Sequence, residues 1–363
     1  MTETAPGGPP RAVMEMRELM LAAAYAAAVR AAVRLGLADA VGDTPAAVED
    51  VARTVGAEPG ALRRLLRALA ARGVFTEQDD GRYAHTELSR SLREDAPRGI
   101  KYNVLWSTEP WTWEVWPRLD EAVRTGKSVF LDLHGKDFFD YLHADAPESA
   151  EVFDRAMTQS SGLSARAIAD TLDLSGAHTV ADIAGGQGLV LATLLERHPT
   201  LNGVLLDLPE VVANADGRLR DGGALAARAR LVPGDCRMEI PVRADVYILK
   251  NILEWDDEST VRTLRNVAAA APPGARVIVI ENLVDGSPEM SFTTAMDLLL
   301  LLNVGGKKHT RDGLVALAGE AGLRVLRVEP VNSYLHLIES IVETEGGAGT
   351  EKGGARGNGA RDA

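Results

Sequence analysis

The sequence predicts an α/β protein in which a Rossmann-like, doubly wound sheet follows a mainly α-helical N-terminal domain of winged-helix type. Three observations predict this fold. A glycine-rich turn at 185–188 joins an apolar, strand-like run at 180–183 to a run with helical spacing. Strand-like and helix-like runs alternate after it, as in a doubly wound parallel sheet. Residues 44–83 have the pattern of two helices and a hairpin. A chain of 363 residues is long enough for both domains.

The composition narrows the class of protein. Hydrophobic residues make up 46% of the chain and charged residues 25%, which is typical of a globular protein. The net charge of -13 argues against a nucleic-acid partner, because the phosphates would be repelled. The single cysteine, Cys236, excludes an internal disulfide and a cysteine-ligated zinc site, and it indicates a reducing compartment. With no pattern of a membrane span or signal peptide, we expect a cytoplasmic protein without a membrane partner.

The first domain is predicted to span residues 12–100. Residues 1–11 contain Gly-Gly-Pro-Pro and are expected to be disordered. From residue 12 to about residue 37 the pattern predicts a long helix that is apolar around much of its circumference. A partner subunit or a second domain would have to cover such a helix. Thr44 and Pro45 predict the start of the next helix, as a capping residue and a first-turn proline.

The helix-turn-helix pattern of this domain allows a second interpretation. On its own, with four arginines in and just after its second helix, it would suggest a DNA-binding repressor. Acidic residues surround these arginines, and no basic arm or wing accompanies them, which argues against DNA binding. The arginines are Arg63, Arg64, Arg67 and Arg72.

Residues 101–170 are predicted to be connecting helices that carry an aromatic segment. Four of the five tryptophans lie within residues 106–116. Such a cluster either forms core between domains or lines a pocket for a flat substrate, and both can hold because a pocket wall is also packed. We take Trp106 and Trp113 as candidate substrate-binding residues.

The glycine-rich turn is the strongest indication of a ligand site. Side chains at Gly185, Gly186 and Gly188 would block a ligand's approach to the backbone, and Asp207 follows the turn by about 20 residues, where an acid can hold a ribose. The third glycine of the dinucleotide fingerprint is missing, and Asp182 precedes the loop. An acid there suits a cationic or hydroxyl-bearing ligand better than a pyrophosphate. S-adenosylmethionine, with its sulfonium and ammonium groups, fits this pattern; an ordinary glycine-rich turn is the alternative.

Further strands complete the predicted domain, residues 171–343. They are expected near 244–249, 276–281, 324–328 and 335–342. Ligands of doubly wound sheets lie at the carboxyl ends of the strands, and several polar residues fall there. The glycine-rich, charged residues 344–363 are expected to form a disordered tail. The strand-end residues are Asp182, Asp207, Asp235, Glu281 and the segment 251–255.

Seven short motifs follow the glycine turn in a characteristic order. With them, the chain from about Met14 to Val342 resembles the bacterial SAM-dependent small-molecule O-methyltransferases, including anthracycline and mitomycin tailoring enzymes. The resemblance implies a winged-helix dimerisation domain, a homodimer, S-adenosyl-L-methionine as cofactor with S-adenosyl-L-homocysteine as product, and an aromatic or polyketide acceptor from antibiotic biosynthesis. The motifs are Leu206-Asp-Leu-Pro-Glu-Val-Val, Gly234-Asp-Cys, Asp245-Val-Tyr-Ile-Leu-Lys, Trp255-Asp-Asp-Glu, Pro272-Pro-Gly, Ile278-Val-Ile-Glu and Gly305-Gly-Lys-Lys-His-Thr.

The resemblance also implies roles for individual residues. The glycines would wrap the methionine part of the cofactor, Asp207 would hold the ribose and Asp235 the adenine. The apolar candidates could equally be helix-packing residues. No tight carboxylate cluster indicates a metal. The expected cofactor-binding residues are Asp182, Gly185, Gly186, Gly188, Asp207, Leu208, Asp235, Cys236, Lys250 and Ser160. The expected substrate-binding residues are Trp106, Trp113, Phe153, Met157, Asn251, Met296, Asp297, Leu300 and Asn303.

The catalytic positions depart from the family pattern. Most members carry a histidine before Asp-Trp that takes the acceptor's proton, whereas this chain has Glu254 directly before Trp255 and is one residue shorter there. Lys308 replaces an acid, and only Glu281 is retained. The candidate catalytic residues are therefore Glu254, Glu281 and His309.

Methyl transfer remains compatible with this departure. It is an in-line displacement from a sulfonium that the cofactor has already activated, so close and collinear placement can carry much of the catalysis. Glu254 could assist as a base for a phenolic or carboxylic acceptor. The alternative is a SAM-binding member that hydroxylates, decarboxylates or cyclises its substrate, as one anthracycline-tailoring relative hydroxylates.

Overall fold

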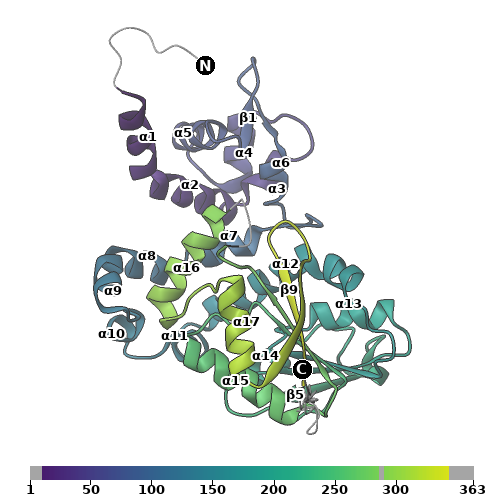
Figure 1. Cartoon of the computed structure of the whole chain (residues 1–363). Coiled ribbons are helices and arrows are strands. Elements are labelled where there is room, and N and C mark those ends of the chain that lie inside the picture. The colour runs from purple at the N-terminus through teal and green to yellow at the C-terminus, as the bar shows by residue number, and fades with distance from the viewer. Residues whose placement is uncertain (1–9, 286–289, 343–363) are drawn as a thin grey trace, which may run out of the picture.

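A computed structural model describes residues 10–285 and 290–342, which form a helical domain and a sheet domain joined by helices (Figure 1). The predicted disordered tail at 344–363 lies outside the described residues. The predicted disordered segment at 1–11 lies outside them too, apart from Pro10 and Arg11, where the first helix begins.

The N-terminal domain is a small helical unit with one β-hairpin. The helix predicted over 12–37 is two helices, because the chain turns at Leu21. The helix predicted to start at Thr44 begins later, at Val48, because Ala46 pairs with Tyr83 as an isolated β-bridge. The elements are α1 (Arg11–Met20), α2 (Ala22–Arg34), α3 (Leu37–Val41), α4 (Val48–Val55), α5 (Pro59–Ala70), β1 (Phe75–Glu77), β2 (Tyr83–His85) and α6 (Glu87–Arg90).

The first helix of this domain has an unusually apolar exposed surface. None of the residues of α1 is buried, although helices at a solvent surface normally turn their apolar residues inward. A surface of this kind marks a site of association. The exposed apolar residues are Val13, Met14, Met16, Leu19, Met20 and Leu21.

Short helices and one long helix connect the two domains. Arg30 of α2 forms a half-buried ion pair with Glu109, with 3.2 Å between nitrogen and oxygen, and Ser149 donates a hydrogen bond to the same carboxylate. These contacts tie the N-terminal domain to the residue before α8 and, through Glu109, to the first turn of α12. The elements are α7 (Lys101–Ser107), α8 (Pro110–Val115), η1 (Trp116–Arg118), α9 (Leu119–Thr125), α10 (Phe130–His134), α11 (Phe138–Ala144) and α12 (Pro147–Thr171).

The described residues of the second domain form a seven-stranded sheet with the order β5-β4-β3-β6-β7-β9-β8. Strands β3 to β7 are parallel, whereas β9 runs antiparallel to β7 and to β8. The strand order reverses between β3 and β6, and ligands of open α/β sheets bind at such a switch point. The strands are β3 (Thr179–Ile183), β4 (Asn202–Asp207), β5 (Ala229–Pro233), β6 (Val246–Lys250), β7 (Arg276–Glu281), β8 (Leu323–Pro330) and β9 (His336–Val342).

Helices cover both faces of this sheet, so its central strands are buried on both sides (Figure 1). Along β3, Val180 and Ile183 belong to apolar clusters on opposite faces. None of the helices built by residues 10–285 and 290–342 has the length and apolar character needed to cross a membrane. The remaining elements are α13 (Leu189–Arg197), α14 (Pro209–Val212), η2 (Ala226–Arg228), α15 (Asp257–Ala270), α16 (Met290–Val304) and α17 (Arg311–Glu320).

Candidate functional site

The glycine turn after β3 passes tightly over the side chain of Asp182. A Cβ atom on Gly185 would lie 2.4 Å from Cγ of Asp182, and one on Gly188 would lie 2.6 Å from Leu219. Gly186 and Gly188 have φ angles of +62° and +80°, which residues with side chains rarely adopt. The turn therefore requires its glycines, and it leaves backbone close to any ligand at the end of β3.

Two buried carboxylates flank this turn. Asp207 at the end of β4 accepts hydrogen bonds from the backbone N–H of Gly186 and of Leu208, both at 2.7 Å. Burial raises the pKa of Asp207 to about 6 and that of Asp182 to about 7. Among the described residues, Oδ2 of Asp182 is buried without a hydrogen-bond partner. Such a group needs a donor or a cation, so both acids fit a ligand that carries hydroxyl and positively charged groups.

A third carboxylate, Asp154 on α12, belongs to this region, although no motif in the sequence singles it out. Burial, together with the charges of Asp207 and Glu210, raises its pKa to about 6. Thr158, one helical turn further along α12, donates a hydrogen bond to Gln187 of the glycine turn at 2.9 Å. The spacing of Asp154, Thr158 and the predicted Met157 on one helix could have revealed these positions.

The residues predicted to surround the adenine lie at the end of β5. Burial favours a higher pKa for Asp235, but hydrogen bonds and charge from Arg237 outweigh it and lower the pKa; the two side chains approach to 2.8 Å. Cys236 is buried, which raises its pKa to about 12, and its carbonyl accepts a hydrogen bond from Asn266. The thiol is therefore unreactive at neutral pH.

Lys250 and Ser160, both predicted to contact the cofactor, make different contacts from each other. Lys250 at the end of β6 lies 3.4 Å from Oγ of Ser161, and its burial lowers the pKa of the ammonium group, opposed by Glu281 and Asp182. Ser160 instead accepts a hydrogen bond from Asn103 of α7 at 2.7 Å. Helix α12 thus presents Ser161 to the strand ends and Ser160 to α7.

Glu281 at the end of β7 holds the loop that follows β6. One of its oxygens accepts hydrogen bonds from the backbone N–H groups of Ile252 and Leu253, at 2.9 and 3.0 Å. Asn251, which starts this loop, has a φ angle of +50°, so the chain turns sharply here. Burial raises the pKa of Glu281 to about 7. Glu281 therefore holds the backbone of this loop in place, and its carboxylate also acts on the charge of the nearby Lys308.

Glu254 forms an ion pair with Lys308, which comes from the loop between α16 and α17. Burial opposes the charged form of Lys308, but Glu254 and Glu281 outweigh it and raise its pKa. The backbone N–H of Lys308 donates to Asp297 at 2.6 Å. A Cβ atom on Gly306 would lie 1.8 Å from the carbonyl oxygen of Glu254, so the two loops are packed backbone against backbone.

His309 makes different contacts from the other two candidate catalytic residues. Its ring is buried, with Nε2 3.4 Å from Oγ1 of Thr260 and Nδ1 3.7 Å from Asp257, both on α15. Burial lowers its pKa. The structure thus brings Glu254 and Glu281 together with Lys308, whereas the His309 ring lies between α15 and the backbone of Leu253, the residue before Glu254.

The predicted substrate-binding residues fall into an aromatic group and a polar group. Trp106 packs edge-to-face on Phe153 at 5.9 Å, and Met296 of α16 packs against the same apolar cluster. Trp113 donates to the carbonyl of Thr108 at 3.0 Å. Met157 and Leu300 are half-buried.

The polar group consists of Asn251, Asp297 and Asn303. The Oδ1 atoms of Asn251 and Asn303 are buried and have no hydrogen-bond partner among the described residues, and Asn303 is only 6% exposed. Unpaired buried oxygens of this kind are available to hydrogen-bond donors of a ligand.

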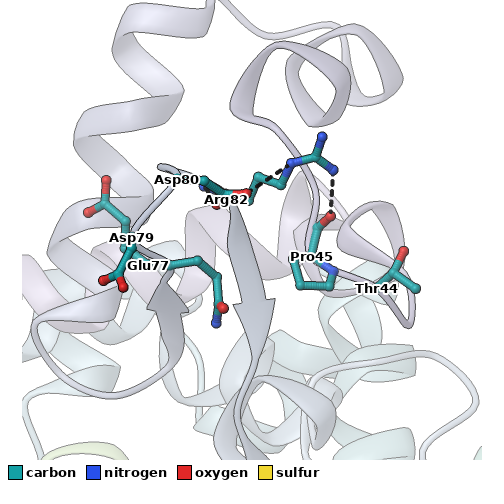
Figure 2. Close-up of a pocket in the computed structure, with 7 residues that line it drawn as sticks. Thr44, Pro45, Glu77, Asp79, Asp80 and Arg82 are labelled. Carbon is teal, nitrogen blue, oxygen red and sulfur yellow. Dashed lines mark hydrogen bonds and ion pairs between the residues drawn. The ribbon is translucent and has the colours of Figure 1, made fainter.

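A separate hollow in the N-terminal domain differs from this site in position and lining (Figure 2). It has a volume of about 660 Å³ and lies between the β1–β2 hairpin and Pro45. Its one arginine, Arg82, is already occupied by Asp80 and by the carbonyl of Pro45. The lining residues are Thr44, Pro45, Glu77, Gln78, Asp79, Asp80 and Arg82.

A Rossmann-like sheet with an acid-flanked glycine turn at its switch point defines a class of nucleoside-cofactor enzymes, and the comparisons identify the family. Residues 116–324 match the model of the O-methyltransferase domain and residues 17–95 that of the O-methyltransferase dimerisation domain. The chain belongs to this O-methyltransferase family. It is a SAM-dependent methyltransferase, and its N-terminal domain is the family's dimerisation domain rather than a DNA-binding unit.

Several characterised relatives cover nearly the whole chain. The mitomycin biosynthesis 6-O-methyltransferase of Streptomyces lavendulae is 39% identical over 90% of this chain and 93% of its own. The phenazine O-methyltransferase PhzM of Lysobacter antibioticus is 34% identical over 85% and 90%. The structure of the mitomycin 7-O-methyltransferase MmcR superposes with a TM-score of 0.82 at 36% identity, covering 91% and 98%.

One of the similar structures contains bound ligands. NcsB1, an O-methyltransferase from neocarzinostatin biosynthesis, was solved with S-adenosyl-L-homocysteine and 1,4-dihydroxy-2-naphthoic acid; it has a TM-score of 0.73 at 33% identity and covers 88% of this chain and 96% of its own. These findings confirm the predicted fold class, the family and the cofactor.

Proposed function

We propose that this protein methylates an oxygen of a phenolic or carboxylic aromatic or polyketide natural-product intermediate. The observation that carries the proposal is the meeting of two features at one edge of the sheet. The acid-flanked glycine turn ends β3, and the loop held by Glu281 follows the neighbouring β6. A methyl donor and its acceptor must lie side by side, and these two strand ends place their candidate sites next to each other.

The residues present fit the cofactor. The buried, unpaired oxygen of Asp182 and the side-chain-free backbone at Gly185 leave polar groups and space for a cationic ligand. Asp207 can accept from ribose hydroxyls while it keeps its two backbone hydrogen bonds, because each carboxylate oxygen has two lone pairs. When bound, S-adenosylmethionine supplies a methyl group that is already activated on a sulfonium.

The protein's own contribution is mainly placement. Holding two reacting groups close and collinear can contribute roughly 7–11 kcal/mol, whereas a base adds about 10²–10⁴-fold. Glu254 is the predicted base, and its ion pair with Lys308 fixes the position of its carboxylate. Glu281 shapes the loop that carries Glu254. His309 is a second candidate base, and its buried ring contacts Thr260 of α15 and the backbone of Leu253.

The acceptor class follows from the aromatic segment and from the relatives. Trp106, Phe153 and Met296 contribute flat and apolar surfaces to one cluster beside α12 and α16. Relatives are named for methylation of phenazine, puromycin and naphthoate precursors. The aclacinomycin 10-hydroxylase RdmB of Streptomyces purpurascens, 34% identical over 82% of this chain, shows that hydroxylation occurs among relatives. Because the mitomycin, phenazine and puromycin relatives are all methyltransferases, methylation is the function we propose.

Assembly and location complete the proposal. The exposed apolar surface of α1 would be buried in the homodimer that the dimerisation domain forms. We place the protein in the cytoplasm, because its one cysteine is buried as a free thiol.

Calorimetry and mass spectrometry test the function. We expect micromolar binding of S-adenosylmethionine and of S-adenosyl-L-homocysteine, followed by the mass gain of one methyl group on a member of a panel of hydroxynaphthoates, hydroxyanthraquinones and phenazine carboxylates. Absence of cofactor binding would overturn the proposal. A product that has gained oxygen or lost carbon dioxide would instead assign the hydroxylase or decarboxylase alternative.

A further inference from the structure

The Lys308–Glu254 pair differs in charge from the catalytic groups of the family that the sequence resembles. There a neutral histidine base is accompanied by acids, whereas here a carboxylate is accompanied by a buried ammonium group. We infer that Lys308 binds the acceptor as an oxyanion and so restricts the enzyme to acceptors acidic enough to ionise before methyl transfer. This inference rests on the proposed function.

The surroundings of Lys308 keep its ammonium group charged and leave N–H donors for an acceptor oxygen. Its side chain is 6% exposed, and Glu254 is its one hydrogen-bonded partner among the described residues. An ammonium group has three N–H donors, so two remain for a ligand. The charged side chains that face it are Glu254 from the loop after β6, Glu281 from β7, Asp297 from α16 and Lys250 from β6.

Charged side chains of alternating sign extend from the glycine turn after β3 to the loop after β6. Asp182 interacts electrostatically with Lys250, Lys250 with Glu281, and Glu281 with Lys308, which forms an ion pair with Glu254. A cationic cofactor at the glycine turn and the ammonium of Lys308 would therefore both lie at the carboxyl ends of the strands, near β3 and β6. An acceptor between them would lie next to the sulfonium of the cofactor and the ammonium of Lys308, and each of these two groups favours its anionic form over its neutral form.

Glu254 is poorly suited to ionise an ordinary phenol. Reference pKa values are about 4.3 for a glutamate and about 10 for a phenol, so the proton transfer is strongly uphill. A carboxylic acid, or a phenol acidified by a conjugated carbonyl, avoids this step.

The reaction then needs no proton acceptor in the site. The hydroxyl proton passes to solvent as the acceptor binds. The oxyanion supplies the electron pair of the new O–C bond, and the electrons of the breaking C–S bond stay on sulfur. Lys308 lies against the reacting oxygen and keeps its own proton throughout.

A coloured acceptor analogue tests the inference. Alizarin (1,2-dihydroxyanthraquinone) changes colour when it ionises, so its titration can be followed in the complex with S-adenosyl-L-homocysteine. We expect bound alizarin to ionise at least one pH unit lower than free alizarin, and this shift to disappear in Lys308→Met. Lys308→Arg, which keeps the charge, should retain it. Lys307→Met is the matched control, because Lys307 is exposed and pairs with Asp257 on the surface.

Methyl transfer provides a second readout. With the acidic 2-hydroxy-1,4-naphthoquinone as acceptor, Lys308→Met should lower kcat/KM at least tenfold, the factor that corresponds to one pKa unit. With the weakly acidic 2-naphthol, wild-type turnover should already be low and change little. The double variant Glu254→Gln/Lys308→Met removes both charges of the Lys308–Glu254 ion pair, so it separates loss of the ammonium from the destabilisation caused by an unpaired Glu254.

The outcomes are distinguishable. The inference would be overturned if alizarin in the wild-type complex ionised at the same pH as free alizarin. It would also be overturned if bound alizarin still ionised at a lower pH in both the single and the double Lys308→Met variants. Equal wild-type turnover of the two naphthalene acceptors would overturn it as well. Failure of the wild-type protein to bind S-adenosyl-L-homocysteine or to methylate any acceptor would overturn the proposed function instead.

Discussion

At the scale of single residues, the glycine turn makes the sharpest demand on the sequence. A methyl group added at Gly185 would overlap the Asp182 carboxylate and Leu205. We expect Gly185→Ala to weaken S-adenosyl-L-homocysteine binding at least tenfold and to lower the free energy of unfolding by about 1–3 kcal/mol, the usual cost of overpacking. Calorimetry and urea unfolding measure the two effects. Gly319→Ala in α17, where a Cβ atom meets nothing within 4 Å, should leave binding unchanged.

Asp154 gives a pH-dependent prediction at the same scale. Burial raises its pKa from 3.8 to about 6, so the folded state holds this proton more tightly than the unfolded state does. Its contribution therefore favours folding below about pH 4 and is lost as the pH rises through about 6. Asp154→Asn should raise the unfolding free energy at pH 8 by about 1–2 kcal/mol and change it little at pH 4.

Unfolding of the cofactor-free protein at several pH values checks this prediction. Asp170→Asn provides the control, because Asp170 lies on the same helix, is exposed and pairs with Arg197. A pH profile for Asp154→Asn that runs parallel to that of the wild type would contradict the assigned burial.

At the scale of elements, two loops must keep contact for the Lys308–Glu254 ion pair to stay in place. A Cβ atom on Gly306 would lie 1.8 Å from the Glu254 carbonyl, so Gly306→Ala must push the loop before α17 away from the loop after β6. We expect kcat to fall at least tenfold while cofactor affinity stays within about threefold, because the cofactor turn lies on other strands. Steady-state kinetics and calorimetry separate the two, and weakened cofactor binding would argue for a wider disturbance.

The elements also show which features a sequence can predict. The glycine turn and the acids at the strand ends depend on short spacings and on period, so they could be located from the chain alone. The late start of α4 depends on a tertiary contact, the bridge from Ala46 to Tyr83, and the apolar pattern of residues 12–37 does not mark the break at Leu21. Lys308 and Glu254 are 54 residues apart, and no local pattern predicts their pairing. The sequence could show only that each departs from the family pattern.

At the scale of the whole molecule, the exposed apolar surface of α1 links the fold to its assembly. Met16 and Leu19 are 63% and 68% exposed, and the dimerisation domain begins at residue 17. Burying such side chains contributes about 1.5–3 kcal/mol each, so charges at these positions should oppose association. We expect Met16→Glu/Leu19→Glu to shift the protein from dimer to monomer and to lower its thermal midpoint.

Sedimentation at several protein concentrations measures this shift. Leu326→Glu is a matched control, because Leu326 is also exposed, at 45%, but lies on the edge strand β8 of the other domain. If the double variant remains a dimer, the subunits must associate through a surface other than α1. If it becomes a monomer that still binds the cofactor, the sheet domain folds its site without the partner subunit, and dimerisation serves stability rather than the chemistry at the strand ends.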